Sequence, residues 1–293
     1  MRHPPPGPAP LVSLNGSRSA ADGAAVPVSP GDVVESALAA VAAGGGEVLV
    51  CARTPCGRES LSPRVVGPLL EALRGAGLGV GAGSGREGAG GRDRGGGSGV
   101  PLSVLASVGA EPDPAGRLAR VRAWTVLPDR AVVRFAEPGA RELAEALLER
   151  GVAVDAEVPV GGPPEPLAQF LAWPVRDPAR VRLVAELPGA DPASVARALR
   201  GLPPVPVVLF GRDAAAWPVL RLALRCGAGT RTGVGDVLRL PDGRPARSNA
   251  ELVEAAVGLG DGPDGREARD RREARDRREA RDRRARRPRA GSR

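Results

Sequence analysis

Hydrophobic and polar positions follow two alternating periods along residues 9–260. Eight short apolar runs have the character of strands, and the stretches between them carry apolar residues three and four positions apart. The runs predicted as strands are residues 10–16, 47–52, 100–106, 130–136, 151–157, 181–187, 205–211 and 230–236. The last run, "TRTGVGD", is weak as a strand and depends on its place in the series. The helical stretches include 31–44, 140–151 and 191–202, and some open on Asp or Pro, as helix starts do.

This alternation predicts the fold class. A parallel pair of strands needs a crossover connection, so strands that alternate with helices indicate a parallel α/β sheet. Eight such units in about 250 residues favour a (β/α)₈ TIM barrel over residues 9–260. A doubly wound open sheet stays as the alternative, because periodicity does not show whether the sheet closes.

Three segments fall outside this pattern: a proline-rich arm (1–8), a glycine-rich insert (79–99) and a charged low-complexity tail (261–293). The insert contains Gly83, Gly85 and Gly88 in the G-x-G-x-x-G spacing of dinucleotide-binding loops. That fingerprint needs a strand leading straight into a helix, whereas more glycine follows here, so we interpret the match as coincidence.

The net charge of +8 lies in the tail. Residues 266–293 hold 14 Arg and 6 Asp or Glu, so they account for the whole excess and leave the rest of the chain neutral. The tail repeats "REARDR" three times and has no apolar stripe, which predicts disorder or a solvated helix. A weak, salt-sensitive attraction to RNA or acidic surfaces through this tail is the only nucleic-acid binding that we expect.

The remaining composition gives weaker information. Three cysteines in a chain of 293 residues do not indicate a disulfide framework. No stretch approaches the roughly 20 apolar residues of a membrane helix, and the start "MRHPPPGPAP" lacks the apolar run of a signal peptide. We therefore expect a cytoplasmic protein that has no contact with membranes.

Several short runs along residues 9–259 together resemble one family. They are "LNGSRSAADGAAVPVSPGDVVESALAAVAAG", "GRESLSPRVV", "DPAGRLARVRAWTVLPD", "AWPVL" and "TRTGVGDVLRLPDGRPARSNAELVEAA", and they keep their order. The chain resembles the β-keto acid cleavage enzymes, whose named member is the 3-keto-5-aminohexanoate cleavage protein. The resemblance implies a TIM barrel, often a homo-oligomer, that binds a divalent metal, usually zinc. It also implies a reaction in which a β-keto acid and acetyl-CoA give acetoacetate and a new acyl-CoA.

The metal-ligand positions depart from that resemblance. Leu49 and Cys51 point to the same side of their strand, because side chains alternate with period two. The family has "H-x-H-x-R" there, with both histidines on the metal, and a Glu in "R-x-G-L-E-D" as third ligand, which corresponds to Gly235. The only histidine, His3, lies in the arm, and Cys51 is interpreted as a small buried hydrophobe. We therefore expect no zinc in this chain.

Other polar positions of the family are partly kept. The resemblance places the catalytic residues at Arg231, Asp236 and Asp155, where Asp155 stands for a family Glu. It also suggests substrate-binding residues, which are Asn15, Arg18 and Arg53. Arg231 with two carboxylates could hold a substrate carboxylate or enolate by bidentate bonds, or could be a self-satisfied structural network.

Three functions therefore stay open. The chain could run the family reaction, although without the metal we expect that reaction to be slowed by orders of magnitude. It could instead be an inactive barrel that binds an acyl-CoA or a keto acid, or that serves as an oligomer partner. The third function is binding of RNA or an anionic surface through the tail. Metal content separates the first two, and deletion of the tail tests the third.

Overall fold

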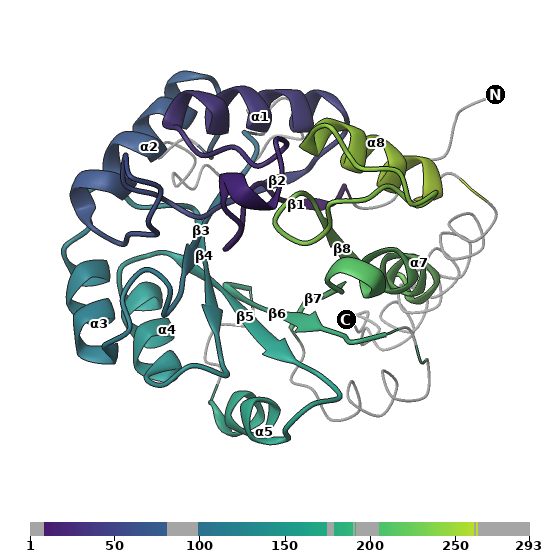
Figure 1. Ribbon diagram of the computed structural model, residues 1–293. Coiled ribbons are helices and arrows are strands. Elements are labelled where there is room, and N and C mark those ends of the chain that lie inside the picture. The colour runs from purple at the N-terminus through teal and green to yellow at the C-terminus, as the bar shows by residue number, and fades with distance from the viewer. Residues whose placement is uncertain are drawn as a thin grey trace, which may run out of the picture.

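The computed structural model describes residues 9–80, 99–174, 179–189, 191, 205–260 and 262. Within them, eight parallel strands close into a barrel in which each strand pairs with its neighbours in sequence and β1 pairs with β8. Figure 1 looks along the barrel, with the helices forming an outer ring. The prediction of a TIM barrel is confirmed, and the open doubly wound sheet is excluded.

The strands are short, as inner strands of a barrel are. Their bounds are β1 Leu11–Ser13, β2 Glu47–Val50, β3 Leu102–Ala106, β4 Arg130–Arg134, β5 Ala153–Pro159, β6 Val181–Glu186, β7 Val207–Phe210 and β8 Gly229–Thr232. Only the first residues of the predicted eighth strand, up to Thr232, belong to β8. The "GVGD" that follows forms a turn.

The described helices follow the strands in alternation. They are α1 Pro30–Ala42, α2 Pro63–Gly75, α3 Pro114–Arg122, α4 Ala140–Glu149, α5 Glu165–Ala172, α7 Ala216–Cys226 and α8 Asn249–Gly260, with 3₁₀ turns η1 Ala20–Asp22 and η2 Asp213–Ala215. The predicted helix over 191–202, most of the insert, the arm and nearly all of the tail lie outside the described residues.

Local sequence signals explain where these helices begin. α1, α2 and α3 each start on proline, whose fixed φ suits the first helical position and whose missing N–H would be unbonded there in any case. The Asp113 carboxylate caps α3 by accepting a hydrogen bond from the Gly116 N–H at 2.8 Å. Because each of these helices follows a strand, the loop before it lies at the carboxyl end of the barrel.

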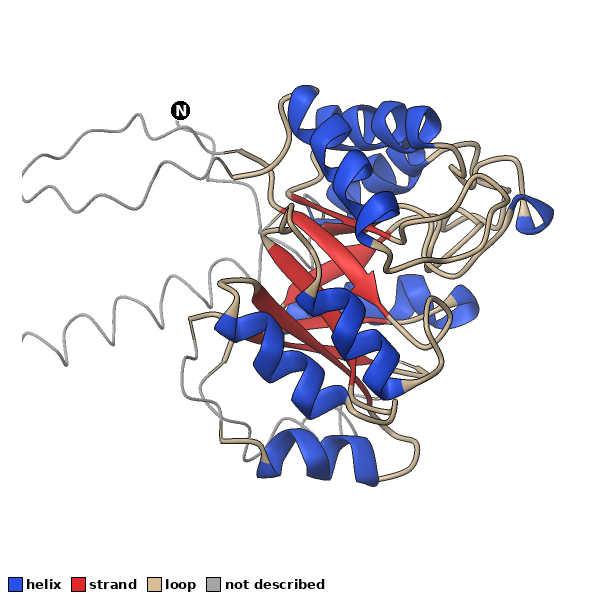
Figure 2. Cartoon of the chain, turned by 90° about the vertical axis from the view of Figure 1, so that its left-hand side faces the viewer, coloured by secondary structure: helices blue, strands red, loops and turns tan. Residues whose placement is uncertain are grey.

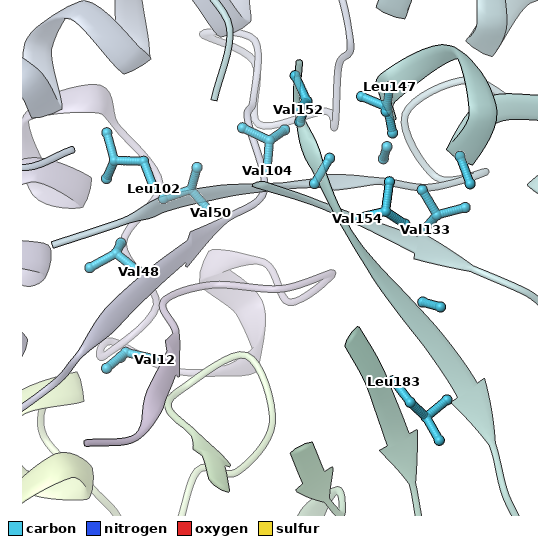
Figure 3. Close-up of a cluster of buried hydrophobic side chains, with 14 of the residues drawn as sticks. Val12, Val48, Val50, Leu102, Val104, Val133, Leu147, Val152, Val154 and Leu183 are labelled. Carbon is cyan, nitrogen blue, oxygen red and sulfur yellow. The ribbon is translucent and has the colours of Figure 1, made fainter. Parts of the chain in front are cut away.

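The two faces of each strand differ in what they bury. In β2, Val48 and Val50 point outward and pack with the helices in the main hydrophobic core, as Figure 3 shows. Leu49 points inward and joins a small apolar cluster inside the barrel with Leu11, Cys51, Leu105 and Val132. Burying each such aliphatic side chain contributes about 1.5–3 kcal/mol to folding, so separating the strands from the helices is strongly unfavourable.

The side view in Figure 2 shows the helices flanking the strands, whose arrowheads point toward the end where long loops gather. In TIM barrels this carboxyl end carries the functional site. No helix in the described part of the chain has the length and hydrophobicity needed to cross a membrane.

Candidate functional site

Arg231 of β8 is the centre of an ion network at the carboxyl end of the barrel. Its Nε and Nη2 donate to the two carboxylate oxygens of Asp236 at 2.9 and 2.7 Å, and its Nη1 donates to Glu157 Oε2 at 2.6 Å. All three side chains are almost fully buried. The predicted pairing of Arg231 with Asp236 is confirmed, and it has the planar bidentate form that arginine offers to carboxylates.

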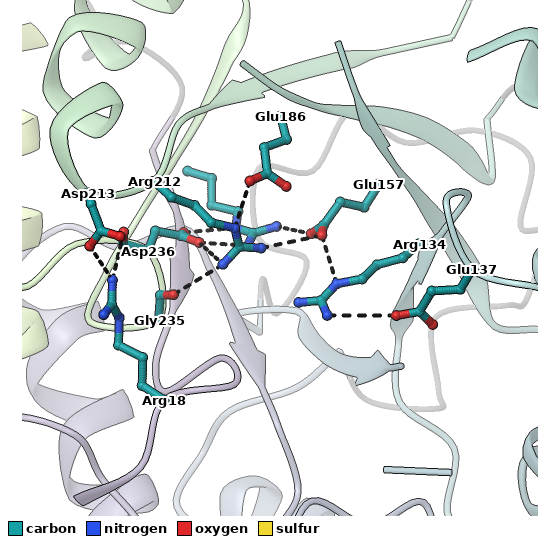
Figure 4. Close-up of polar contacts among 10 residues, drawn as sticks. Arg18, Arg134, Glu137, Glu157, Glu186, Arg212, Asp213, Gly235 and Asp236 are labelled. Atoms are coloured by element: carbon teal, nitrogen blue, oxygen red, sulfur yellow. Dashed lines mark hydrogen bonds and ion pairs between the residues drawn. The ribbon is translucent and has the colours of Figure 1, made fainter. Parts of the chain in front are cut away.

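Glu157 of β5 is contacted by three guanidinium groups, as Figure 4 shows for two of the labelled arginines. Besides Arg231, Arg134 donates through Nε to Oε1 at 2.9 Å, and Arg212 approaches the same oxygen through Nη2 at 3.4 Å. Burial alone would raise the pKa of Glu157, but the charges of Arg231, Arg134 and Arg212 outweigh burial and hold it at about 2. Glu157 is therefore ionised at every physiological pH.

Arg212 enters the network from the segment directly after β7. Its Nε donates to Glu186 Oε1 at 2.8 Å, and its Nη1 lies 3.6 Å from Asp236 Oδ1. The Phe210 ring lies under both cations, 3.8 Å from the Arg231 guanidinium carbon and 5.4 Å from that of Arg212. A cation over an aromatic face is stabilised by the ring quadrupole, so Phe210 helps to fix both side chains.

Two of the three arginines are partly exposed to solvent. The side chains of Arg134 and Arg212 keep 22% and 29% of their area exposed, against 2% for Arg231. Arg134 is also held by Glu137, whose carboxylate accepts a hydrogen bond from the Val108 N–H. Arg134 and Arg212 can therefore meet an anion from solvent, while Arg231 orders the carboxylates beneath them.

The placement of Asp155 beside Arg231 is wrong. Asp155 lies two residues before Glu157 on the same inward face, which puts it one layer deeper in the barrel. There it binds Arg130 and Arg182, each at 2.6 Å, and not Arg231. The error has a simple cause, since period two gives both carboxylates the same direction and only the depth along the strand separates them.

Leu49 and Cys51 lie inside the barrel as predicted, on one face of β2 and its extension. Leu49 is 1% and Cys51 2% exposed, and their neighbours in the interior cluster are aliphatic. Burial, together with the carboxylate of Glu59 nearby, raises the pKa of the Cys51 thiol well above its usual range. The aliphatic side chains that pack on Cys51 in this cluster carry no metal-binding atoms, so Cys51 is a poor ligand where it stands.

Gly235 leaves no room for the third ligand. Its backbone N–H donates to Ser13 O at 2.9 Å, and this bond brings the loop after β8 against the loop after β1. A Cβ at position 235 would lie 2.3 Å from Ser13 Oγ and 2.8 Å from the Gly16 backbone nitrogen. Any side chain there would have to displace the main chain at Gly16.

The residues of this site do not fit the zinc that the family resemblance implies. A catalytic zinc takes three protein donors, whereas the side chains of Leu49 and Gly235 offer none and leave Cys51 as the only donor at these three positions. Among the described residues no group of three His, Cys, Asp or Glu side chains could hold a metal ion. His3 lies outside the described residues.

The predicted substrate-binding residues all lie near the carboxyl end, but two of them brace loops. Asn15 donates to the carbonyls of Cys51 and Pro27 and accepts from the Cys51 N–H, so both its amide hydrogens are engaged. Arg53 donates to the carbonyls of Gly57, Gly16 and Arg18. These contacts fix the loops after β1 and β2.

Arg18, the third predicted substrate-binding residue, lies closest to the ion network. Its Nη2 binds Asp213 Oδ1 at 2.5 Å and the carbonyl oxygen of Asp236 at 3.3 Å. A role for Arg18 in binding substrate stays a prediction.

Sequence reasoning missed Glu157, Arg212 and Glu186. A signal for Glu157 was present, because "VDAEV" places a second carboxylate on the inward face of the same strand. Arg212 follows the seventh strand immediately, at the end where barrel sites lie. Only the fold shows that Glu157 binds Arg231 and that Arg212 approaches the same two carboxylates, Glu157 and Asp236.

Comparison with known proteins gives a family and a set of similar folds. The family model described as beta-keto acid cleavage enzyme matches residues 11–278. No curated protein matches the chain.

Among the similar solved structures, three have a TM-score of 0.55. The ternary complex of ObcA with C4-CoA adduct and oxalate is 14% identical and covers 80% of this chain and 64% of its own. The binary complex of ObcA with oxaloacetate is 15% identical, with coverages of 81% and 66%. The apo homocysteine methyltransferase MmuM from Escherichia coli is 17% identical, with 86% and 95%. The chain thus spans less than two thirds of ObcA. At such low sequence identities, the structural similarity shows a shared fold and nothing more.

Proposed function

Because the chain belongs to the β-keto acid cleavage enzyme family, we propose that it binds a β-keto acid and a CoA thioester at the carboxyl end of its barrel but has lost the metal-dependent cleavage. In the reaction expected from the resemblance, β-keto acid and acetyl-CoA give acetoacetate and acyl-CoA. The residues for carboxylate recognition are present in this chain, and those for the metal are not.

Recognition of the keto acid is supported by Arg134 and Arg212. Both guanidinium groups are partly exposed, and both are anchored on the ionised Glu157. A carboxylate that arrives from solvent can accept bonds from the outer N–H groups of either arginine. Because the cations are already ordered, little side-chain entropy is lost on binding.

Arg231 has a positioning role in this proposal. With three of its N–H groups engaged by Asp236 and Glu157, it holds both carboxylates at fixed places beneath the arginines that face solvent. Asp236 and Glu157 carry one charge more than Arg231, and Arg134 and Arg212 offset the excess. This arrangement gives the site a preorganised field without any metal.

Loss of cleavage is supported by the closed ligand positions. A metal that polarises a carbonyl contributes several kcal/mol to stabilising the transition state, and about 1.4 kcal/mol corresponds to a factor of ten in rate. The proposal rests above all on Gly235, where the backbone of Gly16 fills the space in which a third ligand would begin.

The test measures binding and turnover separately on the full chain. Calorimetry with acetoacetate, and mass spectrometry of CoA esters with ¹³C-labelled acetyl-CoA, are run on chelator-treated and zinc-supplemented protein. We expect keto acid binding that Arg212→Ala weakens by roughly tenfold, and no zinc-dependent exchange of label. Arg239→Ala, which removes an exposed arginine outside this network, is the matched control.

Zinc-dependent turnover would refute the loss of cleavage, and absence of keto acid binding in the wild type would refute the recognition. Cytoplasmic location, a homo-oligomeric state and weak anion binding through the tail remain predictions.

A further inference from the structure

A cavity of about 340 Å³ lies at the amino end of the barrel, away from the strand arrowheads in Figure 2. Glu47 of β2 and Arg182 of β6 supply its charged lining, and the rest comes mainly from the starts of β1, β7 and β8. Its volume is within the range of small-molecule sites. Because it opens at the amino end, it is separate from the arginine network around Glu157.

Arg182 has N–H groups that the residues around it do not use. Its Nη2 donates to Glu47 Oε1 at 2.7 Å and to Asp155 Oδ2 at 2.6 Å, so a single nitrogen serves both carboxylates. Its Nε is buried and has no hydrogen-bond partner. An N–H of a buried cation is costly to leave unbonded, so Arg182 would be stabilised by a further acceptor in the cavity that it lines.

Glu47 has the opposite deficit, because its carboxylate has too little positive charge around it. Arg182 bonds to Oε1, and Arg130 Nε lies 3.9 Å from the same oxygen, while Oε2 accepts no hydrogen bond from the described residues. Burial raises the pKa of Glu47 despite Arg182, and the charge of Asp155 acts in the same direction as burial. A cationic group beside Glu47 would therefore be stabilised.

The charged pair selects a ligand that carries both charges. A simple anion in the cavity would meet Glu47, and a simple cation would meet Arg182, whereas a zwitterion satisfies both. Because Glu47 and Arg182 are in direct contact, the two charges of the ligand must also lie close together. An ammonium and a carboxylate on one carbon atom, as in an α-amino acid, have this spacing.

The apolar part of the lining indicates the kind of side chain. Leu11 and Val208 are buried, Val207 is half-buried, and all three line the cavity. We propose that the cavity binds a small α-amino acid with an aliphatic side chain. Its carboxylate accepts from Arg182, its ammonium donates to Glu47, and its side chain packs on the apolar wall. This site goes beyond the proposed function, because the keto acid is bound at the opposite end of the barrel.

The experiment measures binding of L-alanine, L-valine and L-leucine to the full wild-type chain by calorimetry at pH 7. Each amino acid is compared with the same molecule lacking its amino group and with the same molecule lacking its carboxylate. We expect at least one amino acid to bind, and both of its analogues to bind at least about tenfold more weakly, because each leaves one charged group of the cavity without a partner. Binding of none of the three, or equal binding of an analogue, would overturn the proposal.

Variants locate the bound amino acid. Glu47→Gln keeps the size of the side chain and removes its charge, so it should weaken binding by at least about tenfold. Glu142→Gln, at an exposed glutamate of α4, is the matched control and should leave binding unchanged. Unchanged binding in Glu47→Gln would refute the site, and so would a loss of amino acid binding in Arg212→Ala, which alters the opposite end of the barrel. Keto acid binding, measured separately, decides the proposed function.

Discussion

The barrel interior holds one ion network at each end, and the two are built differently. At the amino end, Glu47, Arg130, Asp155 and Arg182 form a set with equal numbers of cations and carboxylates. At the carboxyl end, three arginines converge on Glu157, and Asp236, Glu137 and Glu186 each pair with at least one of them. Apolar side chains such as Leu49, Leu105 and Val132 lie in the interior between them.

The pKa values show what the difference means. Burial raises the pKa of Glu47 despite Arg182 and Arg130, with the nearby charge of Asp155 acting in the same direction. In contrast, the arginines around Glu157 hold its pKa at about 2 against its burial. The amino-end network thus has equal numbers of arginines and carboxylates. In the carboxyl-end network, Arg134 and Arg212 are partly exposed to solvent. An anion from solvent can reach Arg134 and Arg212 more easily than the two arginines of the amino-end network, which are more buried.

The largest expected difference between the two networks is in the free energy of unfolding that is lost when the central arginine of each is replaced. Arg231→Met leaves Glu157 and Asp236 buried with weaker partners, and we expect a loss of about 3–5 kcal/mol in the free energy of unfolding. Arg182→Met leaves Asp155 with Arg130, and Glu47 can take up a proton, so we expect a loss of about 1–3 kcal/mol. Urea unfolding at pH 7 measures both. Equal losses would show that the two networks do not differ as described.

The two networks should also differ in how the free energy of unfolding changes at acidic pH. The folded-state pKa of Glu157 is lowered from 4.5 to about 2, so its stabilisation is complete above pH 4.5 and is lost as the pH falls toward 2. The full effect is about 3 kcal/mol. Glu47 has a raised pKa, so its contribution is largest below pH 4.5 and is lost at higher pH.

Unfolding between pH 5 and 2 therefore separates the two carboxylates. Glu157→Gln should remove much of the decline in stability across this window, whereas Glu47→Gln should retain it. A decline that disappears in Glu47→Gln but persists in Glu157→Gln would reverse the assignment of the two ends.

A smaller effect tests the closed ligand position. Gly235→Ala places a methyl group against Ser13 Oγ and the Gly16 backbone, and such overpacking costs about 1–3 kcal/mol. Gly162→Ala is the matched control, because no atom lies within 4 Å of a Cβ there. Thermal unfolding of both variants gives the difference. A neutral Gly235→Ala would mean that the loops after β1 and β8 can part to admit a ligand side chain.

Much of the fold could be predicted from the sequence, because alternation of the two hydrophobic periods is a local property repeated eight times. Strand ends were predicted less well, and "TRTGVGD" shows why. Thr230 and Arg231 lie in β8, but the glycines that follow belong to a turn that packs on the loop after β1. Such contacts join residues far apart in sequence and leave no periodic signal.

The candidate site was predicted only in part, for the same reason. Arg231 and Asp236 are five residues apart and meet through one turn, so a local motif identifies them. Glu157 reaches Arg231 from β5, and Arg212 reaches Glu157 from the segment after β7. The choice between Asp155 and Glu157 depends on their depth in the barrel. Depth follows from strand register, which the sequence pattern does not define.

The smallest expected effect concerns how accessible two cysteines near the carboxyl end of the barrel are to alkylation. Cys51 lies in the apolar interior and its pKa is raised by burial, whereas Cys56 is exposed with a pKa of about 7. Iodoacetamide at pH 7 should modify Cys56 and leave Cys51 intact in the folded chain, while urea should expose both. Peptide mass spectrometry measures the two rates. Modification of Cys51 in native protein would show that the interior is open to solvent.

The central claim is that this chain has an ordered arginine network at the carboxyl end of its barrel while the metal positions are closed. Anomalous diffraction at the zinc edge, on crystals of the full chain grown with zinc, tests that claim most directly. We expect no anomalous peak near Leu49, Cys51 and Gly235. A peak within about 2.3 Å of the Cys51 sulfur, with a second protein donor, would contradict it.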